Sequence, residues 1–462
     1  VLVIFNHNEM SISPSVGALS NYLTKIISAP IYNRIKSELE QFLEHFSLGK
    51  KVALKARKFE ETIKGLIIPG IFFEELGFRY FGPIDGHNLD TLIPTLKNVI
   101  TLRGPRILHI LTRKGKGYTF SENNPEDFHS ASPFHIQNGT FLETKRETFS
   151  QVFAKKLVSL ANLDPRIIAI TAAMPKGTGL DLFKKALPAR FFDVGIAESH
   201  AVGFASGLAK QGLRPVVAIY STFLQRSFDQ ILHDVALQNL GVIFALDRAG
   251  LVGEDGPTHH GVFDCGYLRL IPNMVSMAPK DTQELEEMLE FALELNSPVS
   301  LRFPKGEAYT LSAEDKSQKI QLGKAEIMHE GKDICIVAVG SMVKVGLESV
   351  LLLKEEGIGA LLVNARFIKP LDEELFHYVA NNFKLIITLE EGSLHCGFGS
   401  ALLEMYEGAG FLDKVKVIRA GLPDEFIPHG ARSVLLKLYG LDAHSLAERI
   451  RRALKTEIIC QK

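Results

Sequence analysis

The sequence predicts an α/β protein in which parallel sheets are flanked by helices. Two observations support this fold class: apolar, strand-like runs alternate with segments of helical periodicity along almost the whole chain, and glycine-rich or polar turns follow several of the strands. A length of 462 residues favours about three domains over a single hydrophobic core.

Two strands are expected in the first region, which we place at residues 1–140. Residues 1–5 predict a buried strand, and residues 106–112 predict another. Because a natural terminus rarely lies inside a core strand, we expect that sequence before Val1 is missing and that any targeting segment lies there. Residues 119–145 are polar and irregular, and we interpret them as a linker or an active-site loop.

A second region, at residues 146–312, is expected to begin with a helix. Thr148 can cap this helix, Gln151 completes a capping box, and Asp164 followed by a proline ends it. Further strands are expected at residues 167–170, 216–220, 242–246 and 299–303.

The third region, at residues 320–462, follows a polar linker at residues 312–323. A helix is expected at residues 342–356. A basic amphipathic helix is expected at residues 443–455, and we interpret its polar face as solvated. The strands expected here lie at residues 334–339, 360–364, 385–389 and 415–418.

The composition argues against several classes of protein. A formal net charge of −1 gives no electrostatic basis for general binding to nucleic acid or to anionic membranes. No apolar run approaches the roughly 20 residues that span a bilayer. The 4 cysteines lie far apart without CxxC spacing, which indicates a reducing compartment and neither a disulfide scaffold nor a zinc site.

Two strand ends carry groups that suit a bound cofactor. Residues 6–10 follow the first strand, and their amide and carbonyl oxygens suit Mg²⁺, although a plain strand-to-loop turn explains them too. At residues 193–202 a turn through Gly195 leads into a helix with Glu198 in its first turn. Glu198 could simply complement the helix dipole, or it could be a buried carboxyl group that bonds a heterocycle nitrogen.

Residues 220–230 join aromatic and basic groups directly after a strand. Phe223 could belong to the core or could stack on a planar ring. Arg226 could pair with Asp229 on a helix face or could face an anion.

The glycine-punctuated loop at residues 247–261 follows a buried strand and carries an arginine, an acidic pair and two histidines. Because adjacent histidines rarely point at one centre, we favour acid–base chemistry or substrate hydrogen bonding over metal ligation. Arg302 ends another strand and is either part of a surface turn or of a phosphate clamp with Arg226 and Arg248. Lys114 and Lys116 lie in a solvated turn or neutralise a diphosphate.

Together these segments resemble the 1-deoxy-D-xylulose-5-phosphate synthase family over the whole chain. The matching strings occur in the family's order: NHNEMSISPSV (6–16), FGPIDGH (81–87), KGKGY (114–118), GIAESHAV (195–202), YSTFLQRSFDQ (220–230), DRAGLVGEDGPTHHG (247–261) and GLPDEFIPHG (421–430). FGPIDGH and the 247–261 loop are specific to this family within the transketolase-like group.

The resemblance implies a three-domain, transketolase-like architecture with a thiamine-diphosphate-binding fold. Residues 1–140 would be the remainder of the diphosphate-binding domain, 146–312 the pyrimidine-binding domain, and 320–462 the C-terminal domain. The family condenses pyruvate with D-glyceraldehyde 3-phosphate and releases CO₂, which is the first step of the methylerythritol-phosphate route to isoprenoids. Thiamine diphosphate, Mg²⁺, a homodimer, and a bacterial cytoplasm or a plastid are implied.

The resemblance also implies roles for individual residues. Glu198 would bond the aminopyrimidine and Phe223 would stack on it. Asn8 and the backbone carbonyl of Met10 would bind Mg²⁺, and Lys116 would lie near the diphosphate. The substrate residues would be Tyr220, Arg226, Arg248, Arg302 and His129, with Asp255 and His259 in hydroxyl contact and proton transfer.

The chain departs from the family pattern in several places. The GDG motif, whose Asp is a further Mg²⁺ ligand, and the N-terminal histidine segment do not occur. We therefore expect this chain alone to bind cofactor weakly and to turn over little, and an inactive or interaction-only fragment is one alternative. A transketolase or a 2-oxoacid dehydrogenase component is another. The substituted positions are His7 for Asp, Ser199 and His260 for Gln, and Lys305 for Arg.

Overall fold

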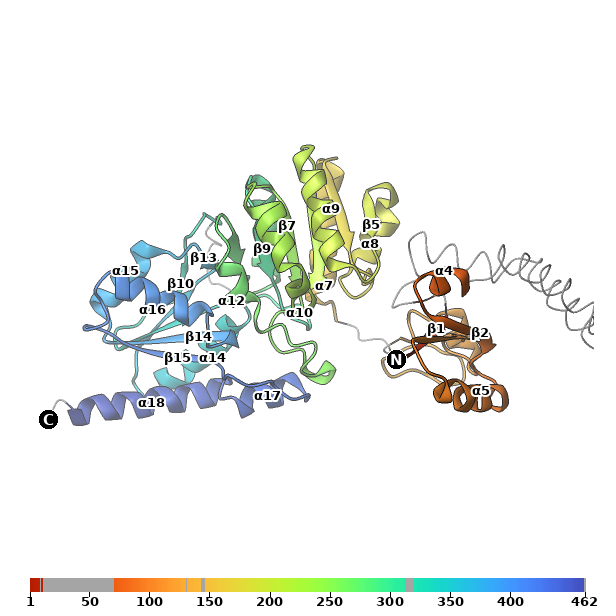
Figure 1. Ribbon diagram of the computed structural model, residues 1–462. Helices are drawn as coiled ribbons and strands as arrows, with labels where there is room; N and C mark the ends of the chain where they lie inside the picture. Colours follow the sequence, from red (N-terminus) through yellow and green to blue (C-terminus); the bar gives the residue numbers. More distant parts are fainter. Residues whose placement is uncertain (9, 11–69, 130, 143–145, 312–318, 461–462) are drawn as a thin grey trace, which may run out of the picture. The chain divides into compact units, whose positions relative to one another are not determined.

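The computed structural model describes residues 1–8, 10, 70–129, 131–142, 146–311 and 319–460 (Figure 1). The chain forms two compact units, unit 1 at Val1–Glu143 and unit 2 at Thr144–Lys462. The predicted linker at residues 312–323 lies largely outside the described residues.

Unit 1 contains a parallel three-stranded sheet in the order β1-β3-β2. Strand β3 lies in the centre and buries Ile107, Leu108 and His109. The elements are β1 Leu2–His7, β2 Arg79–Asp85, β3 Arg106–Leu111, α4 Gly70–Glu75, α5 Leu89–Thr101 and α6 Thr119–Asn123.

Both predicted strands of unit 1 are confirmed, but the predicted burial of the first strand is wrong. Val3 is 39% exposed and Ile4 is 51% exposed. The physical reason is that β1 is an edge strand of the described sheet and pairs with β3 alone. The segment after β3 is irregular as expected apart from the short helix α6, and its aromatic rings pack together, with Phe128 and Phe134 5.0 Å apart.

Unit 2 contains a seven-stranded sheet in the order β13-β8-β9-β7-β6-β4-β5. All neighbours are parallel except β13, which is antiparallel to β8. The strands are β4 Ile167–Thr171, β5 Phe191–Asp193, β6 Arg214–Tyr220, β7 Ile243–Asp247, β8 Val275–Met277, β9 Val299–Arg302 and β13 Phe367–Lys369.

Helices cover both faces of this sheet, because alternate side chains of each central strand point to opposite faces. Val216 and Ala218 pack with α7, α8 and α13, whereas Val217 and Ile219 pack with α9 and the π-helical segment. The elements are α7 Phe149–Leu163, α8 Leu180–Ala186, α9 Glu198–Lys210, α10 Ser221–Leu224, α11 Phe228–Gln230, η3 Ile231–Ala236, α12 Asp264–Arg269 and α13 Thr282–Glu294.

A five-stranded sheet in the order β10-β12-β11-β14-β15 forms the rest of unit 2. Helices α14 and α18 pack in one apolar cluster of this sheet, and α15 and α16 pack in another. The elements are β10 Glu326–His329, β11 Ile334–Ala338, α14 Met342–Glu355, β12 Ala360–Asn364, α15 Glu373–Asn382, β14 Leu385–Ser393, α16 Phe398–Gly408, β15 Lys416–Leu422, α17 Arg432–Leu438 and α18 Ala443–Cys460.

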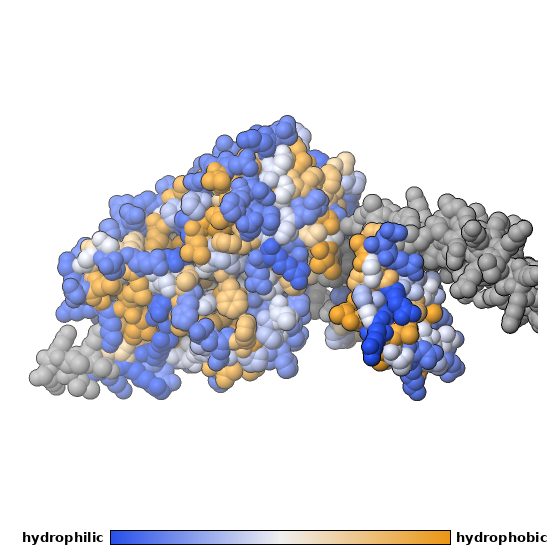
Figure 2. Space-filling view, in the orientation of Figure 1, coloured by the Kyte–Doolittle hydropathy of each residue, from blue (hydrophilic) through white to orange (hydrophobic). Residues whose placement is uncertain are grey.

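The predicted fold class is confirmed: unit 2 is built of mostly parallel sheets flanked by helices, and the capping box of Thr148 and Gln151 is present. Several features were not predicted, and two of them affect how the sheets are built. Strand β14 continues to Ser393, and β13 from the third region joins the sheet of the second. Hydrophilic and hydrophobic residues are interspersed on the visible face of unit 2 (Figure 2). Among the described helices, none combines the length and apolarity needed to cross a membrane.

Candidate active site

The turn between β5 and α9 brings Glu198 to the start of a helix. Asp193 folds this turn, because its Oδ1 accepts the backbone N–H groups of Ala173 at 2.8 Å and Gly195 at 3.0 Å. Gly195 has a φ of 74°, a left-handed conformation that favours glycine. Glu198 follows as the first residue of α9 and is only 5% exposed. The predicted position of Glu198 in the first helical turn is confirmed.

Arg226 forms an ion pair with Glu198. Its guanidinium lies 3.3 Å from both carboxylate oxygens, and the Arg226 side chain remains 59% exposed. Asp229 pairs with His233 at 2.9 Å, so the alternative pairing of Arg226 with Asp229 is wrong. The reason is that residues 225–227 form a 3₁₀ turn rather than a regular α-helix, and Ser199 anchors that turn by donating to the Arg226 carbonyl at 2.9 Å.

Three rings group beside this ion pair. Phe223 on α10 is half-buried and stacks on Tyr220 with centroids 5.7 Å apart and planes inclined by 13°. The His259 ring meets Phe223 edge-on at 5.3 Å. The Arg226 guanidinium carbon lies 6.0 Å from the centre of the Phe223 ring. Arg226 thus contacts both Glu198 and Phe223 and joins the carboxylate to the aromatic group.

Arg248 lies on the other side of Tyr220. Its guanidinium carbon is 3.9 Å from the Tyr220 ring centre, and it donates to Asp247 at 2.7 Å and to the Gly177 carbonyl at 2.5 Å. Burial raises the pKa of Tyr220 above its ordinary range, so the phenol stays protonated at neutral pH. Because Asp247 neutralises Arg248, Arg226 is the more available cation of the two.

The two histidines of the 247–261 loop occupy different environments. His260 is 3% exposed; its Nδ1 accepts the Val252 N–H at 3.1 Å, and Nε2 lies 3.2 Å from the Pro428 carbonyl oxygen. Both ring nitrogens are therefore engaged, and burial lowers the pKa of His260, which keeps it neutral. His259 is half-buried beside Phe223 and pairs through Nδ1 with the Thr258 hydroxyl at 2.9 Å. Only His259 is available for acid–base chemistry.

The Arg302 side chain is buried and paired inside the protein. Its side chain is 8% exposed, and its Nε donates to Asp264 at 2.9 Å. A further bond reaches the Glu391 carbonyl at 3.3 Å. Lys305 pairs with Asp255 at 2.7 Å instead. These contacts do not support a phosphate clamp that includes Arg302, because its charge is already balanced inside the protein.

Unit 1 holds the remaining predicted residues. Asn8 follows β1, and its Oδ1 accepts the Met10 N–H at 3.1 Å in a tight turn. Lys116 is exposed in the glycine-rich turn, and Lys114 Nζ lies 2.7 Å from His129 Nδ1. Burial and the Lys114 charge lower the pKa of His129. No group of three His, Cys, Asp or Glu side chains within the described residues could hold a metal ion.

The sequence analysis missed Glu391, which contacts the 247–261 loop. Glu391 is 2% exposed and accepts the Leu251 N–H at 3.0 Å. Gly250 is required beside it, because a Cβ there would come 2.7 Å from the Glu391 carboxyl carbon. The available signal was the adjacent pair Glu390 and Glu391 at the end of an apolar strand.

Family models cover most of the chain. A 1-deoxy-D-xylulose-5-phosphate synthase model matches residues 1–112, a transketolase pyrimidine-binding domain model matches residues 145–310, and a transketolase C-terminal domain model matches residues 323–446.

Solved structures share the fold. A split-gene transketolase, described as an inactive β4 tetramer, is 30% identical with a TM-score of 0.60, covering 67% of this chain and 99% of its own. A transketolase variant from Pichia stipitis is 19% identical with a TM-score of 0.55, covering 66% of this chain and 46% of its own, and shows the fold alone.

Curated relatives are more similar. The 1-deoxy-D-xylulose-5-phosphate synthase of Caldanaerobacter subterraneus subsp. tengcongensis is 49% identical over 453 residues, or 97% of this chain and 72% of the relative. The synthase of Aquifex aeolicus is 50% identical over 456 residues, or 98% of this chain and 72% of the relative. These identities and the family models favour a synthase over a transketolase. The chain belongs to the 1-deoxy-D-xylulose-5-phosphate synthase family of transketolase-like, thiamine-diphosphate enzymes.

Proposed function

We propose that this chain catalyses the thiamine-diphosphate-dependent condensation of pyruvate with D-glyceraldehyde 3-phosphate to 1-deoxy-D-xylulose 5-phosphate and CO₂. Family membership supports the reaction. The assignment of the site rests on Glu198, which is a buried carboxylate at the start of a helix. Its ion pair with the exposed Arg226 is long, at 3.3 Å. A carboxylate with so much unused hydrogen-bonding capacity suits a ligand.

The local chemistry fits an aminopyrimidine. Glu198 can share a proton with a ring nitrogen, and the half-buried Phe223 can stack on the ring. Arg226 contacts both side chains, so they lie close enough to serve one heterocycle. When bound, thiamine diphosphate supplies the electron sink for decarboxylation and carbon–carbon bond formation.

We assign the acceptor to the side of Phe223 that carries Tyr220 and His259. Arg226, with its exposed guanidinium, would bind the acceptor phosphate, and Arg248 would contribute positive potential. His259 would transfer a proton to the acceptor carbonyl oxygen as the new bond forms, and Asp255 would contact an acceptor hydroxyl group. The buried Arg302 has no part in this proposal.

The finer assignments are also proposals. Asn8 and the Met10 carbonyl offer hard oxygen ligands for Mg²⁺, with Lys116 near the diphosphate and His129 near the substrate. We propose a diphosphate-binding domain at residues 1–140, a pyrimidine-binding domain at 146–312 and a C-terminal domain at 320–462. We also propose a homodimer in a bacterial cytoplasm or a plastid.

Product identification tests the reaction. The chain would be incubated with thiamine diphosphate, Mg²⁺, pyruvate and D-glyceraldehyde 3-phosphate, and NMR would identify the product. We expect 1-deoxy-D-xylulose 5-phosphate and CO₂ in equal amounts, formed slowly because the GDG motif with its further Mg²⁺ ligand does not occur in this sequence. A parallel incubation would replace pyruvate with a ketose phosphate. Two-carbon transfer in that incubation, with no pyruvate consumed in the first, would instead establish a transketolase.

A further inference from the structure

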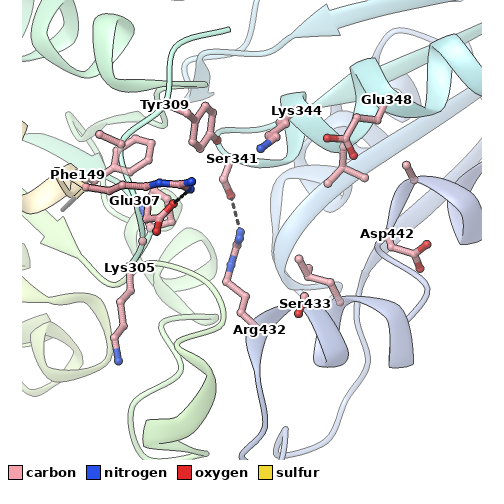
Figure 3. A pocket seen from close by; sticks show the side chains of 17 residues that line it. Phe149, Lys305, Glu307, Tyr309, Ser341, Lys344, Glu348, Arg432, Ser433 and Asp442 are labelled. Carbon is pink, nitrogen blue, oxygen red and sulfur yellow. Dashed lines mark hydrogen bonds and ion pairs between the residues drawn. The ribbon is translucent and has the colours of Figure 1, made fainter. Parts of the chain in front are cut away.

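Unit 2 contains a pocket of about 750 Å³ that the proposed chemistry does not use (Figure 3). It lies between elements of the two sheets of this unit. One wall consists of the start of α7 and the segment after β9, and the other consists of α14 and α17. The pocket is large enough for a small organic molecule.

One part of the wall is basic and rich in hydroxyl groups. Lys344 on α14 is exposed and takes part in no ion pair among the described residues; its Nζ lies 4.9 Å from the Tyr309 ring centre. Ser341 and Arg432 lie next to it in Figure 3 and bond each other at 3.2 Å. Lys344 therefore has no carboxylate within ion-pair distance among the described residues.

Two of the three carboxylates that line the pocket are engaged with other groups. Glu307 is held by Arg146 at 2.7 Å. Asp442 caps the start of α18, accepting the His444 N–H at 3.1 Å. In Figure 3, Glu348 lies beside Lys344 on α14 with no ion pair drawn between them, and Asp442 lies to the right of Ser341 and Arg432. The rest of the lining is largely apolar and includes Phe149, Pro304, Val345 and Leu436. An anionic head group with an apolar body matches these surroundings.

Hydrogen bonds connect the pocket wall to the 247–261 loop. Arg432 Nε donates to Glu391 at 2.8 Å, and the same carboxylate oxygen accepts the Leu251 N–H at 3.0 Å. Ser341 also donates to Glu391, at 2.9 Å. Glu391 is buried, so its position depends on these partners. Both donors from the pocket wall, Arg432 and Ser341, therefore bond Glu391, the residue that accepts from the loop.

We propose that this pocket binds a phosphorylated small molecule and that binding alters the 247–261 loop. The phosphate would bond Lys344, Ser341 and Arg432, and the apolar body would pack on Phe149 and Leu436. A phosphate competes with Glu391 for Arg432 and Ser341, so the bound state holds Leu251 less firmly. By thermodynamic linkage, the ligand can shift the equilibrium between two loop arrangements only to the extent that it binds one of them more tightly than the other. The effect on catalysis rests on the proposed function of the loop, whereas the binding does not.

A binding experiment tests the site. The chain, loaded with thiamine diphosphate and Mg²⁺, would be titrated with inorganic phosphate in a calorimeter. Lys344→Met should weaken phosphate binding about tenfold, the usual effect of losing one charge-assisted hydrogen bond. Lys354→Met removes an exposed lysine from the same helix outside the pocket and should change nothing. Unchanged affinity in Lys344→Met, together with loss in Arg226→Met, would place the phosphate in the acceptor site and overturn the proposal.

Hydrogen exchange tests the coupling without turnover. The Leu251 amide donates to Glu391, so its exchange rate reports the hold on the loop. At a phosphate concentration near the Kd of the unmodified chain, we expect phosphate to speed this exchange in the unmodified chain and in Lys354→Met, and much less in Lys344→Met, whose weaker site stays mostly empty. Phosphate binding that leaves Leu251 exchange unchanged overturns the coupling. Failure of the product assay alone would count against the proposed function and leave this result intact.

Discussion

Two glutamates of unit 2 look alike in sequence context but differ in their surroundings. Glu198 is the first residue of α9 and Glu284 lies in the first turn of α13; both are buried and both pair with an arginine. Glu284 accepts from Arg366 at 2.7 Å, from Asn364 at 3.0 Å and from the Lys280 N–H at 2.7 Å. Glu198 accepts only from Arg226 at 3.3 Å among the described contacts.

Charge balance explains what each glutamate does. Lys280 and Arg366 face Glu284 and Glu326, so two cations meet two carboxylates, and each side chain is at most 8% exposed. This group ties α13 and the end of β8 to β10 and β12, which makes it structural. The Arg226 partner of Glu198 is instead mostly exposed. Burial of a carboxylate is therefore not a sign of chemistry, whereas unused hydrogen-bonding capacity is.

The largest expected effect separates the two glutamates directly. Glu198→Gln should lower kcat by about 10²–10⁴-fold, because an amide cannot exchange the proton that general acid–base catalysis requires. Its thermal unfolding should hardly change. Glu284→Gln should show the reverse, a lower unfolding temperature with near-normal kcat per folded molecule. Steady-state assays and calorimetric scans of both variants measure this, and equal loss of kcat in both would remove the distinction.

Removal of the two arginines should change the free energy of unfolding to different extents. Arg366→Met leaves an unbalanced carboxylate in the interior and should cost about 3–5 kcal/mol of unfolding free energy. Arg226→Met removes an exposed partner and should cost less than about 0.5 kcal/mol. Urea unfolding followed by circular dichroism measures both. A cost for Arg226→Met close to that for Arg366→Met would mean that the Glu198 pair is a structural bridge.

Local patterns explain why much of this was predictable. The capping box at Thr148 and the apolar strands that end at Tyr220 and Asp247 depend on neighbouring residues, so the sequence specifies them. Glu198 could be placed in a first helical turn for the same reason. The positions of single side chains relative to strand ends were therefore accessible without a structure.

Contacts between distant segments were not accessible. Arg302 reads as a free cation at a strand end, but its partner Asp264 lies 38 residues earlier in the chain. Glu391 meets Leu251 across 140 residues. Nothing in the local pattern of β13 showed that it would join the sheet of the preceding region. Pairings of this kind depend on how packed elements meet, which hydrophobic periodicity does not encode.

His109 is a buried titratable group that, unlike the two glutamates, has no charged partner among the described hydrogen bonds. Burial, reinforced by the charge of His7, lowers the pKa of His109 to about 4 from an ordinary value of 6.5. Above pH 6.5 neither state is protonated, and as the pH falls toward 4 only the unfolded state takes up the proton. Unit 1 should therefore lose roughly 3 kcal/mol of stability across that window.

His109→Gln supplies the control for this titration. The glutamine cannot be protonated, and its side-chain oxygen can still accept from the Tyr80 hydroxyl, which lies 2.6 Å from His109 Nδ1. Urea unfolding at pH 7.5, 6 and 5 should show a steep loss in the unmodified chain and a shallower one in the variant. Parallel pH profiles would mean that His109 is already protonated in the folded state.

The smallest expected effect concerns the aromatic ring beside Glu198. Phe223→Leu keeps an apolar side chain but loses the flat face, and should weaken thiamine diphosphate binding about threefold to tenfold, the usual energy of an aromatic pair. Phe228→Leu is the matched control, because Phe228 is also half-buried and meets Tyr267 edge-on at 6.1 Å outside the site. Calorimetric titration of both variants with the cofactor and Mg²⁺ measures the difference. Equal weakening in both would show that Phe223 acts through the packing of α10, and Glu198 alone would then define the cofactor side of the site.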